Sequence, residues 1–310
     1  MGASRWDDKA WDTYSTKNIK NTTRVEEIYT SKHMDPELDP KGITLRESCN
    51  SDVNPQSTPL IVALDVTGSM SGISDSMARE GLKTLATEIY SRKPITDPHI
   101  MFMGIGDAEM GDRAPLQVTQ FEADIRIAKQ LAKIYLEGMG GGNGYESYAL
   151  AWFFASQHTR IDSFEKRGKK GFLFTIGDEL PTPYLRGCDI ERVMGYKTEF
   201  DKISAQELYT MASKQYEVFH IVVEEGNGCQ IMGADKVVKA WSEVVGQNVI
   251  RLSDYTKMAE VIVSTLQIIN GDTTLEEVIS SWDGSTSLVV SKAIKGLSSS
   301  LKTTNGFIKF

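Results

Sequence analysis

Cysteine is scarce in this chain of 310 residues, and the three that occur, Cys49, Cys188 and Cys229, lie far apart and form no Cys-x-x-Cys pair. A disulfide framework and a zinc knuckle are thereby excluded, because both need cysteines at paired spacings. Positive charge is not in surplus either, since 34 Lys and Arg stand against 42 Asp and Glu, a net charge of -8. Attachment to nucleic acid or to an anionic membrane through bulk electrostatics is therefore disfavoured.

Long apolar runs are missing as well. No stretch of about 18 apolar residues occurs, so no membrane-spanning helix is predicted. The first residues lack the apolar core of a secretory signal, and Trp6 stands where a myristoylation signal has Ser or Thr. We therefore expect a soluble, unlipidated protein in a reducing compartment, the cytoplasm.

Sequence signatures of common catalytic sites are also absent. There is no His-Glu-x-x-His, no Gly-x-Ser-x-Gly and no phosphate-binding loop, and His33, His99, His158 and His220 are scattered. We predict a binding protein rather than an enzyme, because no catalytic base or nucleophile is grouped with partners. The alternative is a metal-dependent hydrolase, a phosphatase or a nuclease, since a bound metal ion can activate water.

The apolar pattern divides the chain into three parts. Residues 1–58 are polar without a sustained period and predict an N-terminal arm, either packed along the main domain as a strap or disordered. Residues 59–271 form the predicted main domain. Residues 272–310 predict a helical extension with a Ser/Thr-rich tail, which serves either as a packing element or, through its terminal apolar residues, as a docking tail.

Within the main domain, short apolar runs alternate with segments of helical period. We predict strands at 60–64, 99–105, 116–121, 172–176, 218–223 and 249–252, and helices at 74–91, 123–135, 145–153, 205–215, 236–245 and 258–269. Continuous apolar runs are typical of parallel strands buried on both faces. The alternation therefore predicts a three-layer α/β fold with a doubly wound, mostly parallel sheet, in which ligands bind at the carboxyl ends of the strands.

Oxygen-bearing side chains follow the first predicted strand at once. Asp65, Thr67 and Ser69 are spaced two residues apart, so in an extended turn one carboxylate and two hydroxyls can converge. Gly68 allows the backbone to turn tightly, and Ser71 completes the loop. Hard oxygen donors of this kind suit Mg²⁺ or Mn²⁺. The sequence thus predicts a divalent-metal site here.

Asp65-x-Thr67-x-Ser69 after a buried strand resembles the metal-ion-dependent adhesion site of von Willebrand factor A domains. The resemblance covers roughly residues 58–271 and is similar in particular to uncharacterised proteins of bacteria and their phages, which implies the cytoplasm or a phage particle as location. It implies a Rossmann-like fold in which a second loop supplies a Thr and a third loop an Asp to the metal. Asp178, which follows a predicted strand, matches the third loop.

The second loop departs from the commonest family pattern. Residues 140–147 read Gly-Gly-Gly-Asn-Gly-Tyr-Glu-Ser, closer to a version in which a Glu approaches the metal, and this nominates Glu146, with Gly142 and Asn143 as supporting loop residues. The alternative is structural: Asn143-x-x-Glu146 also has the spacing of a helix capping box. Both interpretations stay open at this point.

The resemblance implies a protein–protein interaction module whose metal captures an Asp or Glu of a partner. A divalent ion between Asp65 and Asp178 gives a neutral set that still attracts a carboxylate, helped by the helix after Ser71, whereas an ionised Glu146 would make the set negative. The resemblance also implies a second form of the interaction module, in which the protein is an adaptor of an AAA+ ATPase, as in several bacterial relatives. The basic run at 166–170 is interpreted as a solvated loop, so nucleic acid is disfavoured as a partner.

Overall fold

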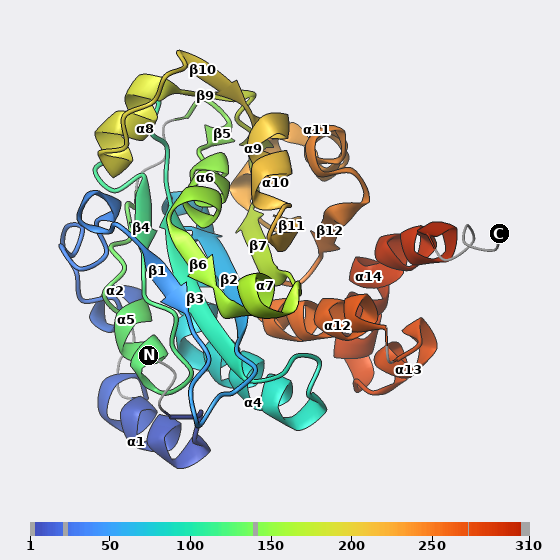
Figure 1. Ribbon diagram of the computed structural model, residues 1–310. Coiled ribbons are helices and arrows are strands. Elements are labelled where there is room, and N and C mark those ends of the chain that lie inside the picture. Colours follow the sequence, from blue (N-terminus) through green and yellow to red (C-terminus); the bar gives the residue numbers. More distant parts are fainter. Residues whose placement is uncertain (1–3, 21–23, 139–141, 272, 305–310) are drawn as a thin grey trace.

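A six-stranded sheet forms the centre of the computed structural model, which describes residues 4–20, 24–138, 142–271 and 273–304, with the backbone only at 69 and at 298–304. The strands lie in the order β12, β11, β7, β2, β3, β4, and all run parallel except β4, which pairs antiparallel with β3 (Figure 1). Their bounds are β2 Thr58–Asp65, β3 Pro98–Ile105, β4 Leu116–Val118, β7 Gly171–Gly177, β11 Tyr216–Val223 and β12 Val249–Leu252. The predicted doubly wound, mostly parallel sheet is confirmed.

The order of the strands fixes where a ligand site belongs. From β2 the chain first adds β3 and β4 on one side, and then crosses back to add β7, β11 and β12 on the other. The winding direction therefore reverses between the neighbours β2 and β7, where Leu64 pairs with Ile176. In doubly wound sheets this switch point leaves a crevice at the carboxyl ends of the two strands.

Adjacent residues of β2 serve two separate hydrophobic cores. Leu60, Val62 and Leu64 join one core, whereas Ile61 and Ala63 join the other. Successive side chains of a strand point to opposite faces, and both faces of this sheet are covered by helices. This is why the strand has a continuous apolar sequence rather than an alternating one.

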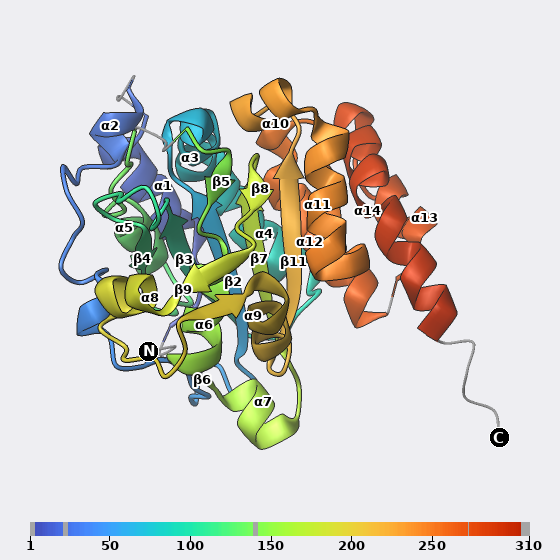
Figure 2. The same ribbon diagram turned by 90° about the horizontal axis from the view of Figure 1, so that it is seen from above.

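Helices cover both faces of the sheet (Figure 2). One core contains apolar residues of α3 Ser71–Ser76, the π-helical turn Met77–Gly81, α4 Leu82–Arg92, α5 Arg126–Leu131 and α12 Met258–Asn270. The other contains residues of α6 Ala149–Gln157, α8 Gly187–Met194, α9 Ala205–Ala212, α10 Asn227–Met232 and α11 Ala234–Val245. In the part of the chain that the structure describes, no helix is long and apolar enough to span a membrane.

The N-terminal arm packs against the main domain over its described length. It forms α1 Asp8–Asn18, α2 Val25–Ile28 and the short strand β1 Arg46–Ser48, which pairs in parallel with β6 Thr159–Ile161. Trp11, Tyr29 and Leu38 of the arm are buried in the first core. Of the two interpretations of the arm, the structure favours the packed strap, and its few apolar residues contribute to the core.

The C-terminal extension is also helical. α13 Leu275–Ser280 begins with a capping box between Thr274 and Glu277, and α14 Gly284–Thr304 packs against α12 and β12. Val290, Ile294 and Leu297 of α14 are buried in the first core. The terminal apolar residues of the predicted docking tail, 307–310, lie outside the described residues.

Several element boundaries differ from the prediction. The helix predicted at 123–135 is reduced to α5, and the helix predicted to begin at Tyr145 begins at Ala149. Tyr145 instead belongs to β5 Tyr145–Glu146, which pairs with β8 Leu180–Pro181. A further short pair, β9 Tyr184–Arg186 with β10 Lys202–Ser204, and the helix α7 Asp162–Arg167 were not predicted. Elements this short show no measurable period in the sequence.

Candidate metal site at the carboxyl edge of the sheet

Two buried aspartates meet at the switch point of the sheet. Asp65 is the last residue of β2, and Asp178 follows the last residue of the neighbouring β7. Both side chains are fully buried, and they follow the paired residues Leu64 and Ile176 at the same edge of the sheet. Burial, and then the charge of Asp178, raise the pKa of Asp65. The structure therefore brings together the two carboxylates predicted from distant parts of the sequence.

Asp65 is held by three hydrogen bonds. Its Oδ1 accepts from the backbone N of Thr67 at 2.9 Å and from the Thr67 hydroxyl at 2.6 Å, while its Oδ2 accepts from the Tyr148 hydroxyl at 3.0 Å. The turn after β2 thus folds the Thr67 hydroxyl back onto the Asp65 carboxylate. The side chain of Ser69 lies outside the described residues, and Ser71 begins α3.

Asp178 is fixed by a segment that the sequence analysis missed. Its Oδ2 accepts from the backbone N of Gly228 at 2.8 Å, at the start of α10. A Cβ on Gly226 would lie 2.3 Å from the Asp178 Cβ, so only glycine leaves room for the carboxylate there. The signal in the sequence is the Gly-x-Gly run that begins three residues after the end of β11, at the same edge of the sheet.

The second loop does not form a helix cap. Asn143 accepts from the backbone N of Tyr145 through Oδ1 at 3.0 Å and donates from Nδ2 to Asp107 Oδ2 at 2.6 Å. Helix α6 begins three residues after Glu146, with Tyr148 at its N-cap, so the capping-box interpretation is wrong. Gly142 is exposed with a φ of 69°, the left-handed region that favours glycine.

Glu146 is a buried carboxyl with an unpartnered oxygen. Its side chain is 1% exposed, and no described residue bonds to Oε2. Burial, followed by the charge of Asp65, raises the pKa of Glu146 to about 11. A buried oxygen without a hydrogen-bond partner lowers the stability of the folded state unless it binds a proton, a water molecule or a cation.

Four acidic side chains lie in this crevice, those of Asp65, Glu146, Asp178 and Glu179. Burial and then Asp178 raise the pKa of Asp65 to about 7, against the lowering effect of the hydrogen bonds from Thr67 and Tyr148. Burial and then Asp178 also raise the pKa of Glu179 to about 7. The largest charge effects on these carboxyls come from other carboxylates, so a cation would relieve them.

The donors present fit a hard divalent cation. Carboxylate oxygens of Asp65 and Asp178 and the hydroxyl of Thr67 are the ligand types that Mg²⁺ and Mn²⁺ prefer. Among the described residues, no group of three His, Cys, Asp or Glu is placed to hold a metal ion by itself. A metal here would therefore depend on hydroxyls and water as well as on carboxylates.

Tyr148 is a further site residue that sequence reasoning missed. Besides bonding to Asp65, its ring packs edge-on against His220 and Trp241, at centroid distances of 5.1 and 5.3 Å. A Cβ on Gly177 would lie 1.9 Å from the Tyr148 hydroxyl. The glycine at the end of β7 thus makes the space through which the phenol reaches the aspartate.

No family model matches the chain, and no curated protein matches it. Among solved structures, the open conformation of the pilus adhesin SpaC from Lactobacillus rhamnosus GG aligns with 76% of this chain and 31% of its own, at 11% identity and a TM-score of 0.47. A von Willebrand factor type A protein from Catenulispora acidiphila aligns with 68% of this chain and 42% of its own, at 14% identity and a TM-score of 0.38. BatB from Bacteroides thetaiotaomicron aligns with 70% of this chain and 100% of its own, at 13% identity and a TM-score of 0.37.

One of these neighbours is described as a von Willebrand factor type A protein, the family that the sequence resembles. The chain corresponds to about a third of the length of the pilus adhesin. These likenesses concern the fold alone.

Proposed function

We propose that this protein is a divalent-metal-dependent protein–protein interaction module that captures an acidic residue of a partner. The observation that carries the proposal is the group of buried, mutually destabilising carboxyls at the switch point of the sheet. Asp65, Thr67 and Asp178 would hold Mg²⁺ or Mn²⁺, and the cation supplies a coordination position that a partner carboxylate can occupy.

Charge counting supports capture of an acidic group. A divalent ion with ionised Asp65 and Asp178 is neutral overall. Glu146 leaves this balance unchanged as long as it keeps its proton, and burial favours the protonated form by raising its pKa to about 11. The site would then accept one further negative charge from outside, which favours a carboxylate over a neutral or basic partner group.

Exposed apolar side chains lie on the segments that border the site. Ile231 is 85% exposed on α10, the helix whose Gly228 N–H holds Asp178. Met110 is 52% exposed in the turn that begins at Asp107, the residue bound by Asn143. Apolar side chains beside a charged centre suit a protein surface, because they exclude water around the central contact.

The test joins metal binding with partner capture. Manganese binding is measured by calorimetry for the wild type, for Asp65→Ala and for Asp52→Ala, a matched control at an exposed aspartate. We expect binding in the wild type and the control and none in Asp65→Ala. Unchanged manganese affinity in Asp65→Ala would refute the assignment.

Partner capture is measured by pull-down in magnesium and in EDTA with the same three proteins. A partner retained only in magnesium, and lost with Asp65→Ala, is the expected result, and an AAA+ ATPase among the retained proteins would identify the adaptor version. Phosphatase and nuclease assays on the same samples test the alternative that the metal serves hydrolysis. Magnesium-dependent turnover that disappears with Asp65→Ala would replace the binding proposal by that alternative.

A further inference from the structure

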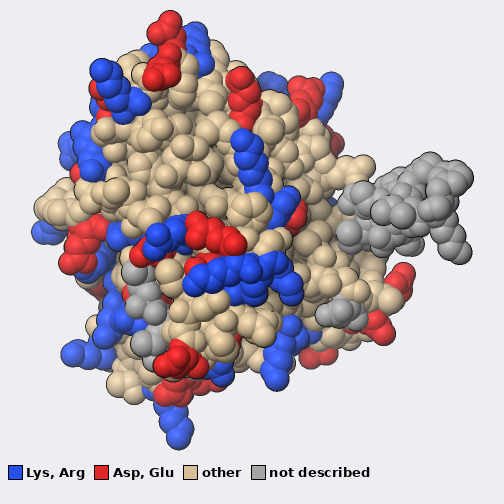
Figure 3. Space-filling view, in the orientation of Figure 1, with Lys and Arg blue, Asp and Glu red and all other residues tan. Residues whose placement is uncertain are grey.

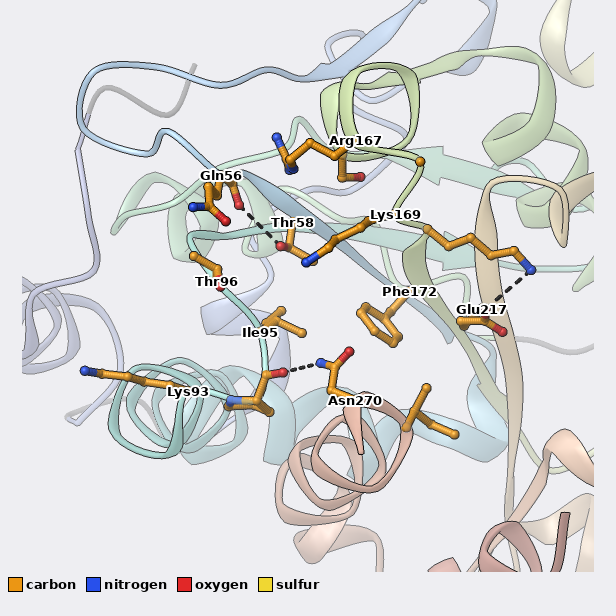
Figure 4. A pocket seen from close by; sticks show the side chains of 15 residues that line it. Gln56, Thr58, Lys93, Ile95, Thr96, Arg167, Lys169, Phe172, Glu217 and Asn270 are labelled. Carbon is orange, nitrogen blue, oxygen red and sulfur yellow. Dashed lines mark hydrogen bonds and ion pairs between the residues drawn. The ribbon is translucent and has the colours of Figure 1, made fainter. Parts of the chain in front are cut away.

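A second hollow lies at the opposite edge of the sheet. A cavity of about 590 Å³ opens at the amino ends of β2, β7 and β11, the end of the strands remote from Asp65. Its walls are the loop from α4 to β3, the loop from α7 to β7, and the C-terminal end of α12 (Figure 4). This volume falls in the range of small-molecule sites, about 300–1,000 Å³.

The cavity is strongly basic. Four cationic side chains line it, and one carboxylate, Glu217, which pairs with Lys170 at 3.3 Å. Arg167 is the last residue of α7 and Lys169 lies on the loop that follows it, whereas Lys93 lies at the opposite rim with its side chain directed outward (Figure 4). Figure 3 shows Lys and Arg side chains gathered over α7, the helix that leads into this loop. A local positive surplus in a chain of net charge -8 indicates an anionic ligand.

Two cations of the wall, Arg167 and Lys169, form no ion pair with a carboxylate among the described residues, whereas Lys170 is paired with Glu217. Arg167 is held in position by neutral oxygens, with Nη1 donating to Asn50 Oδ1 at 2.8 Å and Nη2 to the backbone O of Ser57 at 2.6 Å. Lys169 forms no ion pair with any carboxylate in the described part of the chain. Its side chain reaches across the cavity toward Thr58 (Figure 4).

The interior of the cavity has an apolar side and a hydroxyl group without a hydrogen-bond partner among the described residues. Phe172 and Ile95 face into it, as Figure 4 shows, although little of either side chain is exposed. Ser163 also lines it, is 1% exposed, and its hydroxyl has no hydrogen-bond partner among the described residues. A buried hydroxyl without a partner is costly, and an oxygen of a bound ligand would satisfy it.

We propose that this cavity binds a small phosphorylated ligand of the nucleoside phosphate class. The phosphate oxygens meet Lys169 and Arg167, and the planar part lies toward the apolar side formed by Phe172 and Ile95. Two cations on one wall match the multiple charge of a phosphate ester, whereas a single carboxylate would leave part of the positive charge unmatched. A single-stranded nucleic acid fits less well, because it needs successive stacking surfaces along an open groove and this cavity offers one aromatic ring.

The experiment titrates ADP into the full-length protein by calorimetry, in EDTA so that no divalent metal contributes. We expect saturable binding to the wild type and a loss of about tenfold or more in affinity with Lys169→Glu, with a smaller loss in Lys169→Ala. Lys239→Glu, the same charge change at an exposed lysine of α11, leaves the affinity unchanged. Asp65→Asn also leaves it unchanged, so this result is independent of the proposed metal site.

Three further ligands separate the parts of the proposal. Inorganic pyrophosphate and adenosine, the two halves of the probe, are each expected to bind more weakly than ADP. Absence of ADP binding at millimolar concentration, or equal loss in Lys169→Glu and Lys239→Glu, would overturn the proposal. So would binding of oligouridylate that depends on Lys169 while ADP does not bind, a result that would identify a nucleic-acid surface instead.

Discussion

Replacing Asp65 by Asn is expected to stabilise the metal-free protein at alkaline pH, although it destroys the proposed metal site. In the folded chain, burial and Asp178 raise the pKa of Asp65 from 3.8 to about 7. A carboxyl that holds its proton more tightly when folded favours folding at low pH. That contribution is lost as the pH rises from 3.8 to about 7, and above pH 7 the folded state carries the full cost of the buried charge.

The magnitude follows from the same values. A rise of the pKa from 3.8 to about 7 corresponds to about 4 kcal/mol at pH 8. Asparagine fills the same space, but the amide nitrogen that replaces Oδ2 cannot accept the hydrogen bond from the Tyr148 hydroxyl. The loss of this hydrogen bond costs about 1 kcal/mol. We expect a net gain of about 3 kcal/mol in the free energy of unfolding at pH 8, and less than about 1 kcal/mol at pH 5.

The assay is urea unfolding followed by tryptophan fluorescence, at pH 5 and pH 8, in EDTA and in magnesium. Magnesium should stabilise the wild type by mass action, by about 4 kcal/mol at a thousandfold excess over its dissociation constant, and should not stabilise Asp65→Asn. The control is Asp52→Asn, at an exposed aspartate, which should behave as the wild type in all four conditions.

Two results would contradict this reasoning. If Asp65→Asn lowered stability by the same amount at pH 5 and pH 8, Asp65 would not carry a buried charge in the folded state. If magnesium did not change the unfolding free energy of the wild type at pH 8, the inference that a bound cation relieves this buried charge would be wrong.

Glu146→Gln should change manganese affinity by less than about tenfold and keep or strengthen capture of an acidic partner; a loss as complete as in Asp65→Ala would make Glu146 a ligand. Gly177→Ala should destabilise the protein by about 1–3 kcal/mol in urea unfolding and weaken manganese binding, because its Cβ would lie 1.9 Å from the Tyr148 hydroxyl, whereas Gly296→Ala, in open space, should not destabilise. Burial lowers the pKa of His99 to about 4, so the contribution of this residue to stability is fully present above pH 6.5 and is lost as the pH falls toward 4. In urea unfolding at pH 4.5, the wild type should therefore lose about 3 kcal/mol of unfolding free energy that His99→Asn does not lose.

The order of strands and helices in this protein could be predicted from its amino-acid sequence alone. The continuous apolar run at 60–64 predicts a strand buried on both faces, and the alternation of such runs with helical periods predicts the mostly parallel sheet. These signals are readable because burial imposes a local period on the chain. Since the carboxyl ends of parallel strands meet at one edge, the residues that follow two such runs, Asp65 and Asp178, could be predicted to lie together.

The contacts that hold those residues in place became visible only in the folded protein. Glu146 has a capping-box spacing, yet pairing of Tyr145 with β8 delays the helix and leaves its carboxyl buried. The bonds from Tyr148 to Asp65 and from Gly228 to Asp178 join residues 83 and 50 positions apart. Nor could the sequence show that the basic run at 166–170 borders a cavity, because the walls come from two loops and the end of a helix, which meet only when the sheet has formed. Contacts of this kind depend on packing across the fold, and no local period encodes them.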